Sequence, residues 1–163
     1  MRRWKVVPTL LLVGEGATEK AFLTHVKRLY VLRDSGLCVT IKNAHGKGAK
    51  HVVSWTARQI GDYDRKAVLL DTDTDWSQAV AKKANSARII VLKSEPQFEA
   101  LLLRLIGQSD IGDSKTLKTR LAPFVSNNAL LSENYTQYFD RACLEAGRQS
   151  EPTIDQLLKL LIS

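Results

Sequence analysis

The chain has 163 residues, a length that suits one folded domain with a full hydrophobic core rather than two independent ones. Hydrophobic residues make up 44% of it and charged residues 25%, close to the average of globular proteins, which argues against disordered and membrane-spanning classes. The net charge of +7 favours polyanionic partners, nucleic acid first, although a surplus spread over the surface for solubility explains the same number.

Cysteine and histidine residues indicate neither disulfide bonds nor a zinc site. Cys38 and Cys143 are far apart and stand among apolar residues, so we expect two buried free thiols. The three histidines have neither cysteine partners nor the spacing of zinc ligands. The apolar run at 6–13 is interrupted by Pro8, is too short to span a membrane and has no cleavage site of a signal peptide. We therefore expect a soluble protein of the reducing cytoplasm with no membrane partner.

Short apolar runs alternate with helical patterns over the first two thirds of the chain. Strands are predicted at 9–13, 37–41, 67–70 and 88–92. Helices are predicted at 18–33, 52–60, 76–84 and 97–106. This alternation predicts a Rossmann-like α/β fold with a parallel sheet and helices on both faces. The strand order 2-1-3-4 would bring the loops after the first and third strands together.

The character of the chain changes after Gly107, where no further strand is indicated. Helices are predicted at 114–124, 134–146 and 153–162. We expect an α/β core over 1–107 and a helical extension over 108–163 that packs on the same domain. Pro96, just ahead of the last core helix, is expected in the first turn of that helix.

Carboxylates follow two of the predicted strands at the edge where parallel sheets bind ligands. Glu15 stands between two glycines after the first strand, and Asp71 and Asp73 follow the third. Residues two apart on an extended chain point the same way, so Asp71 and Asp73 are expected side by side, with Asp75 continuing the row. Such close carboxylates repel one another unless a cation neutralises them. This pattern indicates a hard divalent cation, Mg²⁺ or Mn²⁺.

Each acidic segment also has an ordinary structural interpretation. Glu15 between glycines suits a turn, and the aspartates suit a solvated loop that caps the helix predicted from Trp76. Glu19 can approach the same cation as Glu15 or interact with the first turn of its own helix. The position of both segments directly after apolar strands favours a site.

Two segments resemble motifs of a known family. LLVGEGATE at 11–19, followed by Phe22 and Leu23, resembles the first motif of Toprim domains, in the E-G-x-T-E form of RloB-like and OLD-family nucleases. LLDTD at 69–73 resembles the Toprim D-x-D motif.

A third segment extends the resemblance. SEPQFEALLL at 94–103 is similar to the RloB signature S-N-P-x-F-E-x-W-L-L, with Glu95 in place of Asn and Ala100 in place of Trp. The three motifs stand in the order of the family and span residues 8–105, whereas the helical segment after them resembles nothing known to us.

The resemblance implies a Toprim fold and a nuclease that cleaves DNA or RNA with two metal ions, in bacterial defence against phage. It assigns metal ligation and catalysis to Glu15, Asp71 and Asp73, and candidate ligation of a second metal to Glu19, Ser94 and Glu99. Ser94 can instead cap the helix after Pro96, and Glu99 can be an exposed helical glutamate. Phe98 is expected in the core.

Basic residues lie near the same predicted edge. Lys93, directly after the fourth strand, can offset charge that develops on a phosphate, or be a solvated lysine. His45 and Lys47, after the second strand, can contact a nucleic-acid backbone. Their glycine-containing loop lacks the spacing of a P-loop, so hydrolysis of nucleoside triphosphates is not indicated.

Two other functions remain open. A Toprim-like subunit without catalysis can bind nucleic acid or a partner protein of a defence complex, and homo-oligomers are compatible with either function. A receiver-like regulatory domain with a Mg²⁺ pocket explains Asp71 but leaves the Glu15 segment unexplained. Topoisomerases and primases need further domains that 163 residues do not accommodate.

Overall fold

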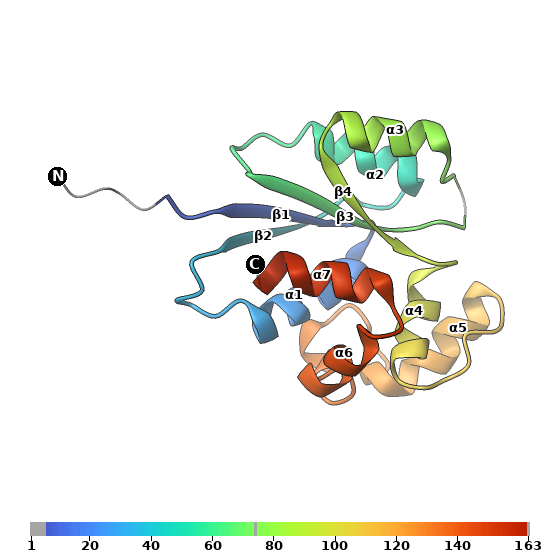
Figure 1. Cartoon of the computed structure of the whole chain (residues 1–163). Helices are drawn as coiled ribbons and strands as arrows, with labels where there is room; N and C mark the ends of the chain where they lie inside the picture. The colour runs from blue at the N-terminus through green and yellow to red at the C-terminus, as the bar shows by residue number, and fades with distance from the viewer. Residues whose placement is uncertain (1–5, 74, 163) are drawn as a thin grey trace.

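A four-stranded parallel sheet forms the centre of the protein. The computed structural model describes residues 6–73 and 75–162 (Figure 1). The strands are β1 (Thr9–Gly14), β2 (Cys38–Asn43), β3 (Arg65–Asp71) and β4 (Ile89–Ser94). They run parallel in the order β2-β1-β3-β4. The predicted α/β class is therefore confirmed, and the strands have the order that places the ends of the first and third side by side.

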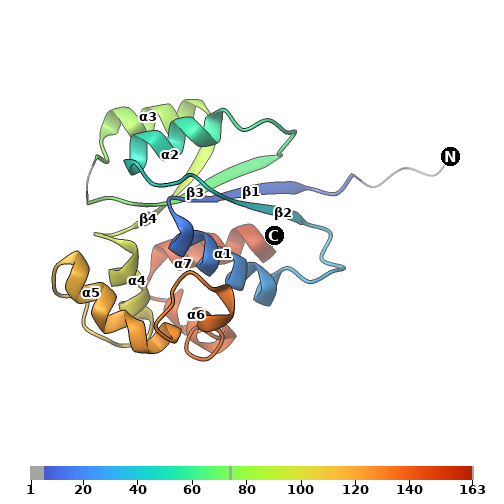
Figure 2. The same ribbon diagram turned by 180° about the vertical axis from the view of Figure 1, so that it is seen from behind.

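Helices cover both faces of the sheet. One face carries α2 (Gly48–Ala57) and α3 (Gln78–Ser86), and the other carries α1 (Ala17–Tyr30), α4 (Phe98–Leu105) and α7 (Pro152–Ile162) (Figures 1 and 2). Alternate strand residues point to opposite faces, so Leu11 and Val13 pack with α2 and α3, and Leu10 and Leu12 pack with α1. No helix of the described residues is both long and apolar enough to cross a bilayer.

The segment after α4 packs on the face that α1 occupies. It contains α5 (Ser114–Leu121), α6 (Arg141–Gly147) and two 3₁₀ helices, η1 (Ala122–Val125) and η2 (Ser132–Tyr135). Its buried aromatic side chains share one cluster with the sheet. Phe22 of α1 makes edge contacts with Tyr135 and Phe139, with ring centroids 5.7 Å and 6.3 Å away. Residues before and after Gly107 therefore contribute to one hydrophobic core.

Several helix boundaries differ from the prediction. The helix predicted at 134–146 is wrong in its first part, because α6 begins only after Asp140, whose side chain accepts a hydrogen bond from Cys143 N. The helix predicted at 114–124 stops being α-helical at Leu121, and the 3₁₀ turn that follows contains Pro123, which cannot donate a backbone hydrogen bond. Hydrophobic spacing alone does not show where a cap or a proline ends the pattern.

Two predictions about single residues are also corrected. Pro96 lies ahead of Gln97, the residue that precedes the first turn of α4, and so it is not in that turn. Cys38 is exposed at the start of the edge strand β2, and Cys143 is half-buried. The expectation of two buried thiols is therefore wrong, although both cysteines are free.

Candidate metal site at the carboxyl end of the sheet

The ends of β1 and β3 bring Glu15 and Asp71 together. These strands are neighbours, with Gly14 paired to Leu69. Glu15 N donates a hydrogen bond to Leu69 O over 3.0 Å, and Asp71 N donates to Glu15 Oε2 over 2.9 Å. The carboxylate of Glu15 is thus fixed by the backbone of the strand that carries Asp71.

Glycine at position 14 lets α1 begin close enough for Glu19 to join them. A Cβ atom on Gly14 would lie 2.8 Å from Lys20 N and 2.9 Å from Glu19 Cβ, so any other residue would push the helix away from the strand. Glu19 is only 9% exposed, and its Oε2 accepts a hydrogen bond from Gly16 N over 3.0 Å. This bond pairs an N–H group at the start of the helix and orients the carboxylate.

Glu15, Glu19 and Asp71 form a carboxylate cluster. One oxygen from each lies within 4.8 Å of the others, which is close enough for the three to hold one metal ion. The cluster lies in a hollow of about 320 Å³, referred to below as the acidic hollow. Its other lining residues are Gly16, Ala17, Thr18, Asp73, Gln97, Glu99, Ser114 and Lys118. β1, β3 and α1 together therefore position the three carboxylates of a candidate cation site.

Burial and repulsion by nearby carboxylates raise the pKa of all three clustered carboxyls. Burial, the largest cause, and the charges of Glu19 and Glu15, the next largest, together raise the pKa of Asp71 to about 8. Burial is also the main reason that the pKa of Glu19 is raised to about 7, with Glu15 and Glu99 adding to it. Burial raises the pKa of Glu15, but the hydrogen bond from Asp71 N opposes that rise. Without a cation, the cluster therefore favours bound protons over full ionisation.

Two buried oxygen atoms at this edge make no hydrogen bond to the part of the chain that the structure describes. Asp71 Oδ1 and Ser94 Oγ accept or donate no hydrogen bond among the described residues. Asp71 and Ser94 are paired across β3 and β4, and Ser94 is fully buried. A buried polar atom left unpaired costs about 1–3 kcal/mol, so such atoms favour a ligand that is bound during function.

The ordinary interpretations of Ser94 and Glu99 do not hold. Ser94 ends β4 and caps no helix, because Gln97 precedes the first turn of α4. Glu99 is 8% exposed and lines the acidic hollow. Phe98 is fully buried, as predicted.

The acidic row does not continue as predicted after Asp73. Asp73 is exposed and lines the acidic hollow, but it is outside the close cluster. Asp75 binds the start of α2 instead, where its carboxylate accepts hydrogen bonds from Ala49 N over 2.5 Å and Lys50 N over 3.2 Å. Gly48 has a φ of +85°, and a Cβ there would lie 2.8 Å from that carboxylate. The prediction that Asp75 faces the site is therefore wrong.

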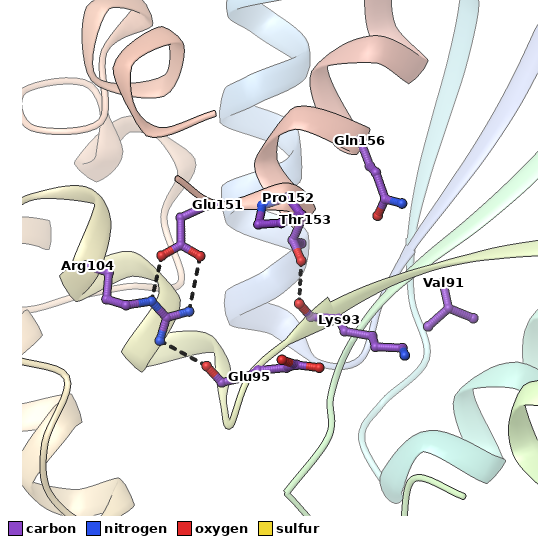
Figure 3. A pocket seen from close by; sticks show the side chains of 8 residues that line it. All are labelled: Val91, Lys93, Glu95, Arg104, Glu151, Pro152, Thr153 and Gln156. Atoms are coloured by element: carbon purple, nitrogen blue, oxygen red, sulfur yellow. Dashed lines mark hydrogen bonds and ion pairs between the residues drawn. The ribbon is translucent and has the colours of Figure 1, made fainter. Parts of the chain in front are cut away.

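Lys93 lines a different hollow, of about 430 Å³, at the free edge of β4 (Figure 3). Its ammonium lies over the ring of Trp76, 4.8 Å from the centroid. Figure 3 shows Arg104 on the other side of this hollow, where it forms an ion pair with Glu151. The nitrogen and oxygen atoms of this pair are 2.6 Å apart. The hydroxyl of Thr153 donates a hydrogen bond to the backbone oxygen of Lys93 (Figure 3). The structure does not bring Lys93 into the acidic hollow, and its catalytic role stays a prediction.

The two other predicted nucleic-acid contacts lie in the loop ahead of α2. His45 and Lys47 are exposed and have left-handed backbone conformations, and neither lines the acidic hollow. Gly46 N, between them, donates a hydrogen bond to Glu15 O over 2.6 Å. The loop thus borders the site through its backbone, and the contact with nucleic acid stays a prediction.

Comparisons with protein-family models, with curated proteins and with solved structures found no match. The likeness to Toprim domains therefore stays a prediction that depends on three short motifs.

Sequence reasoning missed the contribution of α5. Ser114 and Lys118 are four residues apart on one face of this helix, and both line the acidic hollow. Lys118 is the one basic side chain among the lining residues that the structure describes. Nothing in the sequence of α5 distinguishes Lys118 from other exposed lysines, so only the packing of the chain reveals its position.

Proposed function

We propose that the protein is a metal-dependent nuclease that binds Mg²⁺ or Mn²⁺ through Glu15, Glu19 and Asp71. The observation that carries this proposal is the close approach of three carboxylates from β1, α1 and β3 at a ligand-binding edge. Carboxylate oxygens are the ligands that hard divalent cations prefer. Asp71 Oδ1, which has no hydrogen-bond partner among the described residues, is available to such a cation.

The chemistry of phosphodiester cleavage matches these groups. A divalent cation supplies stabilisation of negative charge on phosphate and lowers the pKa of water. The chain orients the ligands through the hydrogen bonds from Asp71 N to Glu15 and from Gly16 N to Glu19. Lys118 supplies a positive charge at the rim for the phosphate of a substrate.

Further ligands are available for a second cation. Asp73 and Glu99 line the same hollow, and Ser94 is paired with Asp71 across the sheet. The order of the motifs, which resembles RloB-like and OLD-family nucleases, supports cleavage of DNA or RNA. A role in cytoplasmic defence against phage is proposed from that resemblance alone.

A cleavage assay tests the proposal. Purified protein is incubated with plasmid, single-stranded DNA and tRNA in Mg²⁺, in Mn²⁺ or in a chelator, beside Glu15→Gln and Asp71→Asn. We expect cleavage only with metal and a loss of about 100-fold or more in each variant, because each removes a charged ligand. Glu133→Gln and Asp34→Asn, which change exposed carboxylates outside the hollow, serve as matched controls and should cut like the wild type.

Two outcomes would contradict the nuclease. Cutting that survives the chelator, or that both variants retain, would show an activity that does not need the cluster. Metal-dependent retardation of nucleic acid in a gel without any cutting would assign a binding subunit instead.

A further inference from the structure

A mainly apolar hollow of about 340 Å³ adjoins the acidic hollow. The two share Thr18, Glu99 and Lys118 among their lining residues. The apolar walls come from α5, η1 and the loop after it, and consist of Leu121, Ala122, Val125, Ala129 and Leu130. A ligand with a charged group at the carboxylate cluster can therefore extend an apolar part past Lys118 into this apolar hollow.

Two hydrogen bonds hold the outer wall of the apolar hollow in place. Tyr135 is fully buried, and its hydroxyl donates a hydrogen bond to Ala129 O over 2.8 Å. Asn134 Nδ2 donates to Asn128 O, also over 2.8 Å. The loop thus has a fixed shape before any ligand arrives, which reduces the entropic cost of binding.

Polar groups stand at the rim beside an exposed leucine. Asn128 Oδ1 accepts a hydrogen bond from Leu130 N over 3.1 Å, which leaves its Nδ2 group as a donor. The structure gives the side-chain amide of Asn127 no hydrogen bond to any described residue. Leu130 is 59% exposed although it lines the hollow. The rim therefore offers amide donors and acceptors around an apolar surface that a ligand can cover.

We infer that the apolar hollow binds an unpaired nucleobase next to the phosphate that the carboxylate cluster acts on. This inference rests on the proposed function. A nucleotide joins a phosphate to a flat ring with apolar faces and hydrogen-bonding edges. The apolar walls match the faces, the amides of Asn127 and Asn128 match the edges, and Lys118 lies between base and cluster. A base inside a duplex is stacked and cannot enter, so the substrate class is single-stranded or unpaired nucleic acid.

Binding measurements separate the base from the phosphate. The probes are a labelled single strand, a strand of equal length that lacks its bases, and a duplex, each titrated with protein in Ca²⁺ and followed by fluorescence anisotropy. The wild type should bind the base-containing strand more tightly than either other probe. Leu130→Ser should weaken that binding about five-fold through lost apolar contact and leave the baseless strand unchanged.

Leu131→Ser is the matched control, because Leu131 is the neighbouring residue, is 49% exposed and lines neither hollow. It should bind all three probes like the wild type. Equal losses for the two leucine variants, or equal affinity of the wild type for the strands with and without bases, would overturn the inference. Neither result would contradict the proposed nuclease, which is tested separately by metal-dependent cleavage and its loss in Asp71→Asn. Conversely, base-dependent binding without any cleavage would keep the base site and reject the nuclease.

Discussion

The acidic hollow and the hollow at the edge of β4 differ in whether their charged side chains are balanced by partners of opposite charge. In the β4-edge hollow, Arg104 pairs with Glu151 at 2.6 Å and with Asp110 at 3.2 Å, and Lys93 lies over an aromatic ring. In the acidic hollow, five carboxylates face one exposed lysine, and one buried carboxylate oxygen has no partner among the described residues. The first arrangement stabilises the fold. The second disfavours ionisation of its carboxylates when no cation is bound, which is what the proposed metal site requires.

The largest expected difference is the response to Mg²⁺. A ligand at about 100 times its dissociation constant stabilises the folded state by about 2.7 kcal/mol. For a chain of this size, that free energy raises the melting temperature by about 5–10 °C. Thermal unfolding at pH 8 should show this rise for the wild type and for Arg104→Gln, and only a small one for Asp71→Asn. A rise of the same size in all three proteins would mean that Mg²⁺ binds elsewhere.

In metal-free protein, substitutions in the two hollows should change stability in opposite directions. Arg104→Gln leaves Glu151 charged, only 15% exposed and without its partner, and should lower the free energy of unfolding by about 2 kcal/mol. Asp71→Asn removes a carboxylate that its neighbours repel. It should raise the free energy of unfolding by an amount on the order of 1 kcal/mol at pH 8. Urea unfolding in a chelator measures both. If both variants are less stable than the wild type, the charged groups of both hollows stabilise the metal-free fold and the difference between the hollows is contradicted.

The gain from Asp71→Asn should depend on pH. The pKa of Asp71 is raised from 3.8 to about 8, so the wild type has its full stability below pH 4 and loses it as pH rises through 8. Asparagine does not titrate, and the gain should therefore be absent near pH 4 and grow up to pH 8. The same urea series, repeated across this range, tests the sign. A gain that is larger in acid would show that Asp71 is ionised and stabilised in the metal-free protein.

The smallest expected effect distinguishes Lys118 from Lys93. Lys118→Gln removes an exposed charge at the rim of the acidic hollow and should lower kcat/KM for nucleic acid about three-fold. Lys93→Gln should leave it unchanged, because its ammonium lies over Trp76 in the other hollow. Steady-state cleavage at low salt compares the two. A larger loss for Lys93→Gln would support the catalytic role predicted from its place after β4.

The sequence was sufficient for the parallel sheet, and it predicted the meeting of Glu15 with Asp71 on the condition that the strands have the order 2-1-3-4. Apolar runs that end at Gly14 and Asp71 predict strand ends, and parallel strands place those ends at one edge. An acidic residue directly after an apolar strand is a local sequence signal, so it can be recognised without knowledge of the tertiary fold. The convergence of the two carboxylates follows from the strand order alone.

Side-chain direction beyond the strand ends was not predictable in the same way. Asp75 turns to the start of α2 because Gly48 leaves room for its carboxylate, a contact between segments far apart in sequence. Lys118 lies at the site because of the way α5 packs, and no sequence motif predicts that packing. Glu19 was a candidate ligand from its spacing to Glu15, but its place in the cluster depends on the close approach of α1 to β1 that Gly14 allows.

Proton release on metal binding tests the central claim most directly. Metal-free protein at pH 7 is titrated with Mn²⁺ in a calorimeter, in buffers with different heats of ionisation. Asp71, with a pKa of about 8, and Glu19, with a pKa of about 7, hold protons that a cation must displace. We predict saturable binding that releases about one proton per ion and is abolished or strongly weakened in Asp71→Asn. Binding that releases no protons, or equal binding by the variant, would contradict a cation site at Glu15, Glu19 and Asp71.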